Sequence, residues 1–233
     1  MCSFLGLESL FIDIMMNVGI IFYAAQRSGD AALAEIALQH SLTSRRVLVR
    51  GDGSTAHEGI FDTVTGDFLR QSTRQGLRGD TCWSRGLAWA IYGFGTVYEY
   101  TRDPRFLETA EACARFYLSH TPVDGVPLWD YDVSPQDPHW HDSSAAAISA
   151  SGLLQLATLT PDPAHAALYR DTALHILKSL SKPPYLATEH PEWQGILREG
   201  VYHVHKNLGV SESVMWGEYF FVEAVDRALQ LLP

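Results

Sequence analysis

Residues 142–159 read DSSAAAISASGLLQLATL. After the first three residues almost every position is small or apolar, on all sides of a helix, which is typical of a helix buried in a protein core. The stretch that follows, residues 164–181, instead carries polar side chains along one face, as a helix with one exposed side does. Together the two stretches predict a buried inner helix covered by an amphipathic outer helix.

The same pattern extends along the rest of the chain. Hydrophobic stretches of helical length alternate with segments rich in Gly, Pro, Asp and His. Those that begin near Glu8, Trp83, Ser143 and Ser213 are apolar nearly all round, whereas the others are amphipathic. We predict helices at about these ranges: residues 7–28, 30–44, 82–102, 104–120, 142–159, 164–181 and 211–232.

Alternating buried and amphipathic helices predict an all-α fold, a double-layered α/α toroid in which outer helices shield an inner ring. No alternation of strands and helices suggests a parallel α/β fold. We expect residues 1–233 to form a single domain. Seven helices make three and a half pairs, and a closed ring would need more, so we expect an incomplete toroid. Its open edge would expose apolar surface and favour self-association.

Composition excludes several classes of protein. The net charge of −10, from 17 basic and 27 acidic side chains, argues against a nucleic-acid-binding surface. The apolar run from Leu10 to Ala25 contains a carboxylate and follows no basic residues, which favours a buried helix over a signal peptide or a membrane span. Three scattered cysteines fit neither a disulfide framework nor a zinc site, and they predict a reducing, cytoplasmic location: Cys2, Cys82 and Cys113.

Three long loops are rich in Trp, His, Asp, Arg and Gly, the composition expected where a rigid scaffold carries function: residues 47–81, 121–142 and 182–210. Within the first, the turn sequence DTVTGDF predicts a short hairpin. His139 and His141 lack a clear third ligand, so we predict no metal site. Asp142 or Ser143 is expected to cap the helix that follows.

Asp13 is a carboxylate within the otherwise apolar sequence FIDIMMN, residues 11–17. Burial would raise its pKa, which suits a general acid near neutral pH. The alternative is an aspartate at a helix start, satisfied by backbone N–H groups. The sequence alone leaves both interpretations open.

Arg85 and Trp89 are four residues apart and so share one helix face. A guanidinium beside an indole suits a uronate, whose carboxylate pairs with the arginine while its ring stacks on the tryptophan. The alternative is a structural ion pair and a core tryptophan. His57 ends the glycine-rich loop at residues 50–57, where it would bind a sugar hydroxyl, orient a carboxylate or simply support the turn.

At these residues the chain resembles the unsaturated glucuronyl hydrolase family, glycoside hydrolase family 88. The resemblance runs from about Phe11 to Arg227. Six motifs in order carry it: FIDIMMN (11–17), VRGDGSTAH (49–57), TCWSRGLAWAIYGF (81–94), DGVPLWD (124–130), DSSAAAISASGLLQL (142–156) and WGEYFFVEA (216–224). It implies an (α/α)6 barrel and, as substrate, an oligosaccharide with a 4,5-unsaturated uronic acid at its non-reducing end.

The implied chemistry is hydration of a vinyl ether. By resemblance, Asp13 protonates C4 and activates the water that adds at C5, after which the hemiketal opens and releases the sugar. The residues implied to line the substrate site are His57, Thr73, Gln75, Arg85 and Trp89. An acid, a base and water suffice, so no cofactor is implied.

The resemblance also shows departures and leaves alternatives. It implies a further N-terminal region with a second aspartate, which these residues do not include. Ser211 and Glu218 stand where the family pattern would have aspartates. Two other functions remain open: an unsaturated rhamnogalacturonyl hydrolase, which shares the barrel and the chemistry, and an inactive or sugar-binding remnant.

Overall fold

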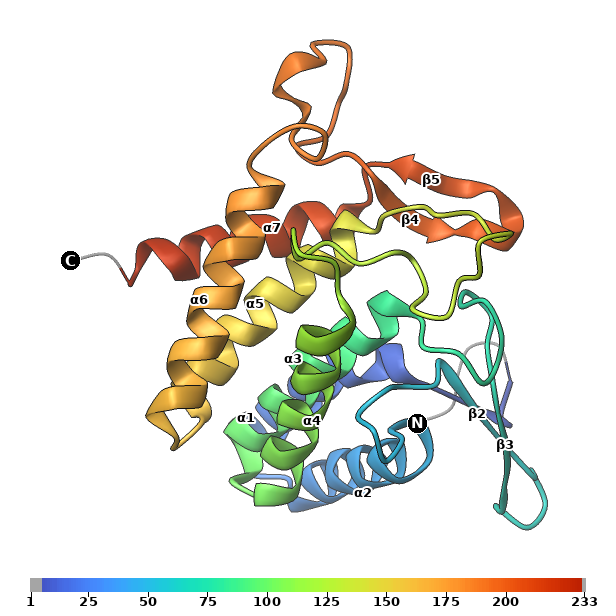
Figure 1. Cartoon of the computed structure of the whole chain (residues 1–233). Coiled ribbons are helices and arrows are strands. Elements are labelled where there is room, and N and C mark those ends of the chain that lie inside the picture. The colour runs from blue at the N-terminus through green and yellow to red at the C-terminus, as the bar shows by residue number, and fades with distance from the viewer. Residues whose placement is uncertain (1–5, 232–233) are drawn as a thin grey trace.

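The computed structural model describes residues 6–231, so Cys2 and the last residue of the helix predicted over 211–232 lie outside the described residues. Seven α-helices dominate the fold (Figure 1): α1 (Val18–Ser28), α2 (Ala31–Leu48), α3 (Ser84–Thr101), α4 (Pro104–His120), α5 (Ser143–Leu159), α6 (Pro163–Leu180) and α7 (Met215–Leu229).

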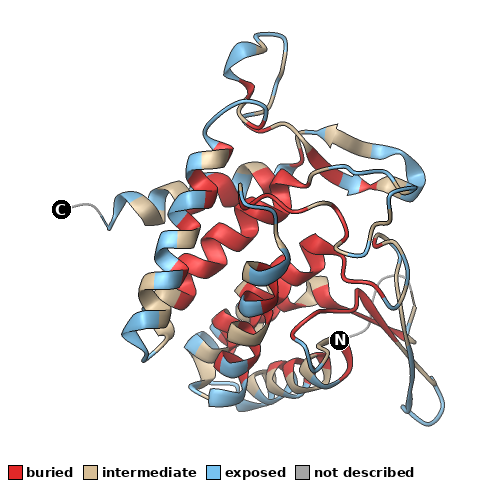
Figure 2. Cartoon of the chain, viewed as in Figure 1, coloured by how far each residue is buried: buried red, intermediate tan, exposed pale blue. Residues whose placement is uncertain are grey.

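The helices form two layers. In the inner layer α1 packs against α3, α3 against α5, and α5 against α7. The outer helices α2, α4 and α6 pack against α1, α3 and α5, respectively. Figure 2 shows that α3 and α5 are buried along most of their length, whereas α2, α4 and α6 each keep an exposed side. The predicted alternation of inner and outer helices is confirmed.

Local sequence explains where the helices begin. The side chains of Asp30, Asp103, Asp142 and Asp162 accept hydrogen bonds from backbone N–H groups at the starts of α2, α4, α5 and α6. Proline follows immediately at the starts of α4 and α6, where its fixed φ suits a first helical turn and no N–H is needed. Asp142, which was one of the two predicted candidates, is therefore the N-cap of α5.

The helix predicted over residues 7–28 is wrong in its first half. Strand β1 (Ser9–Phe11) and the 3-10 turn η1 (Ile12–Met16) precede α1. β1 pairs antiparallel with β2 (Glu58–Phe61), which pairs with β3 (Phe68–Ser72) in the hairpin that the sequence predicted. The backbone N–H of Ile12 also donates to the carbonyl of His57, so tertiary pairing overrides the helical pattern.

A second hairpin was not predicted. β4 (Gly200–His203) pairs antiparallel with β5 (Leu208–Glu212) within a segment expected to be loop and the start of a helix. Asn207, between these strands, and Gly209, near the start of β5, adopt left-handed backbone conformations where the chain reverses its direction. The short 3-10 turns η2 (Ala187–Glu189) and η3 (Val204–Lys206) flank β4, and α7 begins only at Met215.

The two ends of the inner layer carry exposed apolar side chains. Ile20 on α1 is 70% exposed, and Met215 on α7 is 81% exposed, with Tyr219 and Val222 exposed further along α7. These surfaces correspond to the open edge expected from the sequence, and self-association through them stays a prediction. Among the described residues, no helix combines the length and the apolar character needed to cross a membrane.

Gly93 lets α3 approach the segment that carries Asp13. A Cβ atom at Gly93 would lie 2.6 Å from Cβ and 2.8 Å from the carbonyl oxygen of Met15 in η1. We expect Gly93→Ala to lower the free energy of unfolding by about 1–3 kcal/mol through overpacking, although alanine is the better helix former.

Urea unfolding followed by circular dichroism measures this loss. Gly51→Ala is the matched control, because nothing lies within 4 Å of a Cβ at Gly51, and its effect should stay within about 0.5 kcal/mol. Equal stability of Gly93→Ala and the unmodified chain would contradict the close approach.

Candidate functional site

The predicted site residues gather where the inner helices begin. Asp13 lies in η1, and His57 stands immediately before β2. Thr73 and Gln75 follow β3, while Arg85 and Trp89 occupy the first two turns of α3. Direct contacts join five of these six residues. His57 contacts Asp13, Thr73 and the backbone N–H of Gln75, and the Gln75 side chain contacts Arg85.

Asp13 has one carboxylate oxygen with no good hydrogen bond. Its side chain is 38% exposed, and Oδ2 lies 3.4 Å from Nε2 of His57, at the long end of the hydrogen-bond range. Oδ2 itself is buried and makes no hydrogen bond of good geometry to any described residue. Catalytic hydrogen bonds are often long before a substrate binds, so this geometry suits a reactive carboxylate.

His57 is oriented by the backbone of the neighbouring loop. Its Nδ1 accepts hydrogen bonds from the backbone N–H groups of Arg74 (3.0 Å) and Gln75 (3.2 Å) and lies 3.1 Å from Oγ1 of Thr73. An Nδ1 that accepts two N–H bonds carries a lone pair, so in the neutral ring the proton is on Nε2. That proton faces Asp13, and His57 therefore serves as a donor to the carboxylate.

Packing keeps the imidazole in this orientation. Its ring centroid lies 5.1 Å from that of Phe11 and 4.5 Å from that of Trp83. The His57 side chain is almost completely buried. The ring cannot turn without disturbing both aromatic neighbours and the two backbone hydrogen bonds.

The pKa of Asp13 differs from the expectation drawn from the sequence. Burial raises the pKa of this carboxyl, but hydrogen bonding to His57, the charge interaction with His57 and the nearby positive charge of Arg85 together outweigh burial. The resulting pKa lies below the ordinary value of 3.8. The expected upward shift is therefore wrong for the chain without substrate, because the sequence does not reveal which groups face Asp13.

Arg85 is a buried junction between four segments. Its Nη1 lies 3.3 Å from Oδ2 of Asp142 and also donates to the carbonyl of Val201. Its Nη2 donates to Oε1 of Gln75 (2.6 Å) and to the carbonyl of Tyr202 (2.9 Å). The structural ion pair left open by the sequence is present. Direct pairing of Arg85 with a substrate carboxylate stays a prediction, and these acceptors already occupy both Nη atoms.

Trp89 has one feature of a core tryptophan and one feature of a sugar-binding tryptophan. Its indole packs edge-to-face on Phe220, as a core tryptophan does. Its Nε1, however, is buried and has no hydrogen-bond partner among the described residues. An unsatisfied buried donor is costly, and an acceptor on a bound sugar would satisfy it.

Three aromatic neighbours of the site were not predicted from the sequence. Trp83 and Trp216 both contact the Arg85 guanidinium, with ring centroids 4.4 and 4.8 Å from its Cζ. His203 on β4 is buried, its Nδ1 has no partner among the described residues, and burial together with nearby positive charges lowers its pKa. Trp83 stands two residues before Arg85, which was a usable signal, but Trp216 and His203 are brought in by tertiary packing.

Glu218 has a structural contact here. Its carboxylate accepts the backbone N–H groups of Ile196 (2.8 Å) and Leu197 (3.0 Å) and so holds the loop before β4. The Ser211 hydroxyl donates to the carboxylate of Glu199. Within the described residues no cluster of three metal-ligating side chains occurs, which includes the region of His139 and His141.

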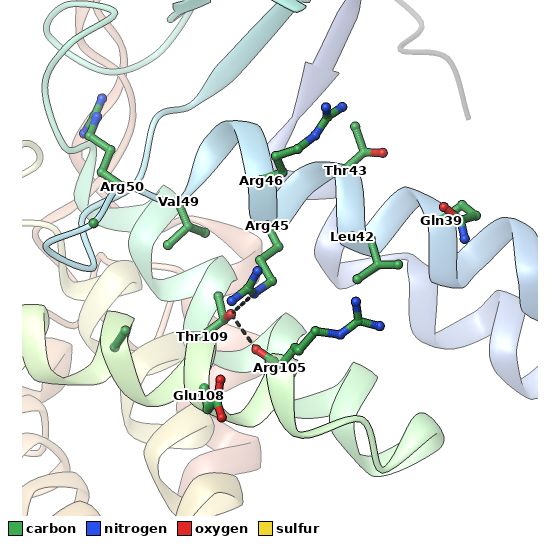
Figure 3. A pocket seen from close by; sticks show the side chains of 12 residues that line it. Gln39, Leu42, Thr43, Arg45, Arg46, Val49, Arg50, Arg105, Glu108 and Thr109 are labelled. Carbon is green, nitrogen blue, oxygen red and sulfur yellow. Dashed lines mark hydrogen bonds between the residues drawn. The ribbon is translucent and has the colours of Figure 1, made fainter.

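A cavity of about 740 Å³ lies away from Asp13, between α2 and α4, as Figure 3 shows. Arginines line much of it, and none of the predicted site residues does. Its chemistry is therefore separate from that of the site around Asp13.

The histidine geometry predicts one tautomer. In ¹⁵N NMR spectra of histidine side chains, Nε2 of His57 should be protonated and Nδ1 unprotonated at neutral pH, because two backbone N–H groups point at Nδ1. Loss of the signals in a His57→Gln variant assigns them. A protonated Nδ1 would rule out the donor arrangement.

The lowered pKa of Asp13 predicts a pH-dependent contribution to stability. The ionised carboxylate stabilises the folded chain above about pH 4, and this contribution is lost as the pH falls below the ordinary pKa of 3.8. By calorimetry, Asp13→Asn should therefore lower the melting temperature more at pH 7 than at pH 3. Asp226→Asn, at an exposed position on α7, is the control. A loss of melting temperature in Asp13→Asn that is larger at pH 3 than at pH 7 would contradict the lowered pKa of Asp13.

No family model matches this chain, but individual known proteins are similar to nearly all of it. The unsaturated glucuronyl hydrolase of Bacillus sp. (strain GL1) is 36% identical over 219 residues, which are 94% of this chain and 58% of the relative. The unsaturated chondroitin disaccharide hydrolase of Streptococcus pyogenes serotype M1 is 32% identical, over 94% of this chain and 55% of its own length.

Solved structures of unsaturated glucuronyl hydrolases are also similar to this chain. The crystal structure of an unsaturated glucuronyl hydrolase specific for heparin superimposes with a TM-score of 0.90 at 34% identity, covering 96% of this chain and 60% of that one. This chain thus spans little more than half the length of the curated relatives it matches. Since similarity in sequence and in fold extends over nearly all of its residues, the chain belongs to the unsaturated glucuronyl hydrolase family.

Proposed function

We propose that this chain hydrolyses oligosaccharides that carry a 4,5-unsaturated uronic acid at the non-reducing end, by hydrating the double bond. The observation that carries the proposal is the carboxylate of Asp13, partly exposed and faced by the Nε2 of a buried histidine. The names of the relatives support the substrate class, since they describe hydrolases of unsaturated glucuronyl and chondroitin sugars.

The proposed reaction needs one carboxyl group and one water molecule. Protonated Asp13 gives its proton to C4 of the vinyl ether, and the positive charge that develops at C5 is captured by water. The carboxylate of Asp13 takes the proton that this water loses. The product is a hemiketal at C5, which opens and releases the remaining sugar. Asp13 ends the cycle protonated, as it began, so the proposal includes no cofactor.

In this proposal, substrate binding raises the pKa of Asp13, so that the carboxyl can hold the proton that it gives to C4. A uronate carboxylate bound near Asp13 adds a negative charge, and a like charge raises the pKa of a carboxyl. His57 can donate to Oδ2 while the other oxygen carries the proton. In this arrangement His57 is a positioning residue.

The other residues have separate roles in the proposal. The unpaired Nε1 of Trp89 would donate to a sugar oxygen. Thr73 and Gln75 carry the loop that orients His57, and Gln75 also links this loop to Arg85. Arg85 contributes positive charge close to Asp13 and holds the segments that form the site.

We further propose that residues 1–233 act as one catalytic domain in a reducing, cytoplasmic compartment. A single hydrophobic core runs from Leu10 to Ala224, which supports one domain. Cys82 and Cys113 are buried free thiols, and burial raises the pKa of Cys82 to about 12. Unreactive buried thiols fit such a compartment.

The test follows the ultraviolet absorbance of the double bond in an unsaturated chondroitin disaccharide. The purified chain should remove this absorbance, and Asp13→Asn should lower turnover at least about a hundredfold, the usual contribution of a general acid and base. Asp226→Asn should leave turnover unchanged. Circular dichroism checks that each variant is folded.

Other outcomes discriminate among the alternatives. Retained turnover in Asp13→Asn would refute the assignment of the acid. A folded chain that binds the disaccharide without turnover would support a sugar-binding remnant. Faster turnover of an unsaturated rhamnogalacturonyl disaccharide would support the related hydrolase that shares this chemistry.

A further inference from the structure

The cavity between α2 and α4 is lined by four arginines and one carboxylate. Arg45, Arg46, Arg50 and Arg105 contribute to its walls, and Glu108 is the acidic lining residue. The whole chain has only 17 basic side chains against 27 acidic ones. Four arginines at one cavity are therefore a strong local concentration of positive charge in an acidic protein.

Three of these arginines lack a partner of opposite charge. Arg105 pairs with Asp103. The other ion pairs that arginines form within the described residues involve different arginines, so Arg45, Arg46 and Arg50 are not neutralised in this way. A bound anion would offset the positive charge that these side chains bring to the cavity.

Two of the three are held in place by neutral groups. Nε of Arg45 donates to Oγ1 of Thr109 on α4 at 2.8 Å, which directs its guanidinium between the helices, as Figure 3 shows. Its Nη atoms make no hydrogen bond with the described residues and remain available. Arg50 donates to Gln71 (2.9 Å) and to the carbonyl of Thr81 (3.1 Å), and its charge also helps to lower the pKa of Asp52, so it is positioned and only partly compensated.

The remaining lining indicates the size and type of ligand. Leu42, Val49 and Ala112 give the cavity an apolar part that a bare inorganic ion would leave unused. A volume of about 740 Å³ falls in the range of small-molecule sites. Guanidinium groups bind tetrahedral oxyanions and carboxylates through paired hydrogen bonds.

We propose that this cavity binds an anionic sugar through a sulfate or phosphate ester, at a site separate from Asp13. Arg45 on α2 contacts the ester oxygens, while Arg46 and Arg50, whose side chains point away from Arg45 in Figure 3, add longer-range attraction. The apolar lining packs against the sugar ring. The proposal does not depend on the hydration reaction, because no residue of the Asp13 site lines the cavity.

Isothermal titration calorimetry tests this proposal with glucosamine 6-sulfate and glucose 6-phosphate as probes, at constant ionic strength in chloride buffer. Glucose is the neutral comparison. We expect saturable binding of at least one ester and none of glucose. The double variant Arg45→Gln/Arg46→Gln should weaken binding by at least about tenfold, since each charge-assisted contact contributes that order of affinity.

Arg27→Gln is the matched control, because Arg27 is an exposed arginine in the last turn of α1 and does not line the cavity. It should leave the affinity unchanged. The single variant Arg46→Gln alters an exposed side chain and keeps the test valid if loss of the Thr109 contact disturbs folding. Tighter binding of one ester would identify sulfate or phosphate as the natural group.

Three results would overturn the proposal. The first is the absence of saturable binding to the folded chain. The second is an unchanged affinity in the arginine variants. The third is an equal loss in Arg27→Gln, which would mean that the probes respond to overall charge and not to this cavity.

Discussion

The ion pair between Arg85 and Asp142 joins the parts of the molecule that form the site. Asp142 caps α5 through the N–H groups of Ser144 and Ala145, and Arg85 stands in the first turn of α3. Both side chains are almost fully buried. Removing one partner of a buried pair typically costs about 3–5 kcal/mol, because the other charge is left uncompensated. The pair therefore fixes two inner helices, β4 and the Gln75 loop relative to one another.

Small residues allow the same helices to approach closely. A Cβ at Gly152 on α5 would lie 3.0 Å from a side-chain carbon of Ile91 on α3, and Gly93 gives similar room to η1. The position of Asp13 thus depends on the packing of α3 as well as on its own segment. The same contacts pack the core and position the site. Substitutions at glycines far from Asp13 in sequence will therefore change the position of Asp13.

The sequence was sufficient for the helical layers but not for the strands. The stretches that form α2 to α6 are either amphipathic or apolar nearly all round over a helical length, and these predictions were confirmed within a few residues. β1 has an apolar sequence that suits a helix equally well, and its pairing with Glu58–Phe61 decides the outcome. β4 and β5 are short and irregular, and their register shifts next to Gly200. Non-local pairing of this kind leaves little local signal.

The sequence names candidate site residues one by one, but it does not give the electrostatics around them. The resemblance singled out Asp13 and His57, yet the direction of the Asp13 pKa shift depends on contacts between residues that are distant in sequence. Asp142 was one of two predicted caps because it stands just before α5, whereas its second role, 57 residues away at Arg85, has no local signature. The residues present can be read from the local sequence, whereas the electrostatic field around them depends on the folded structure.

The common direction of the inner helices has an electrostatic consequence. α3, α5 and α7 all begin at the end of the molecule where Asp13, Arg85 and Trp216 lie. The dipole of each helix places the equivalent of roughly half a positive charge at its first turn, and at α5 the carboxylate of Asp142 offsets part of it. Several such dipoles that begin at one end of the molecule produce a local positive potential that a count of charged side chains does not reveal. A protein with a net charge of −10 can in this way carry a positive potential around Asp13.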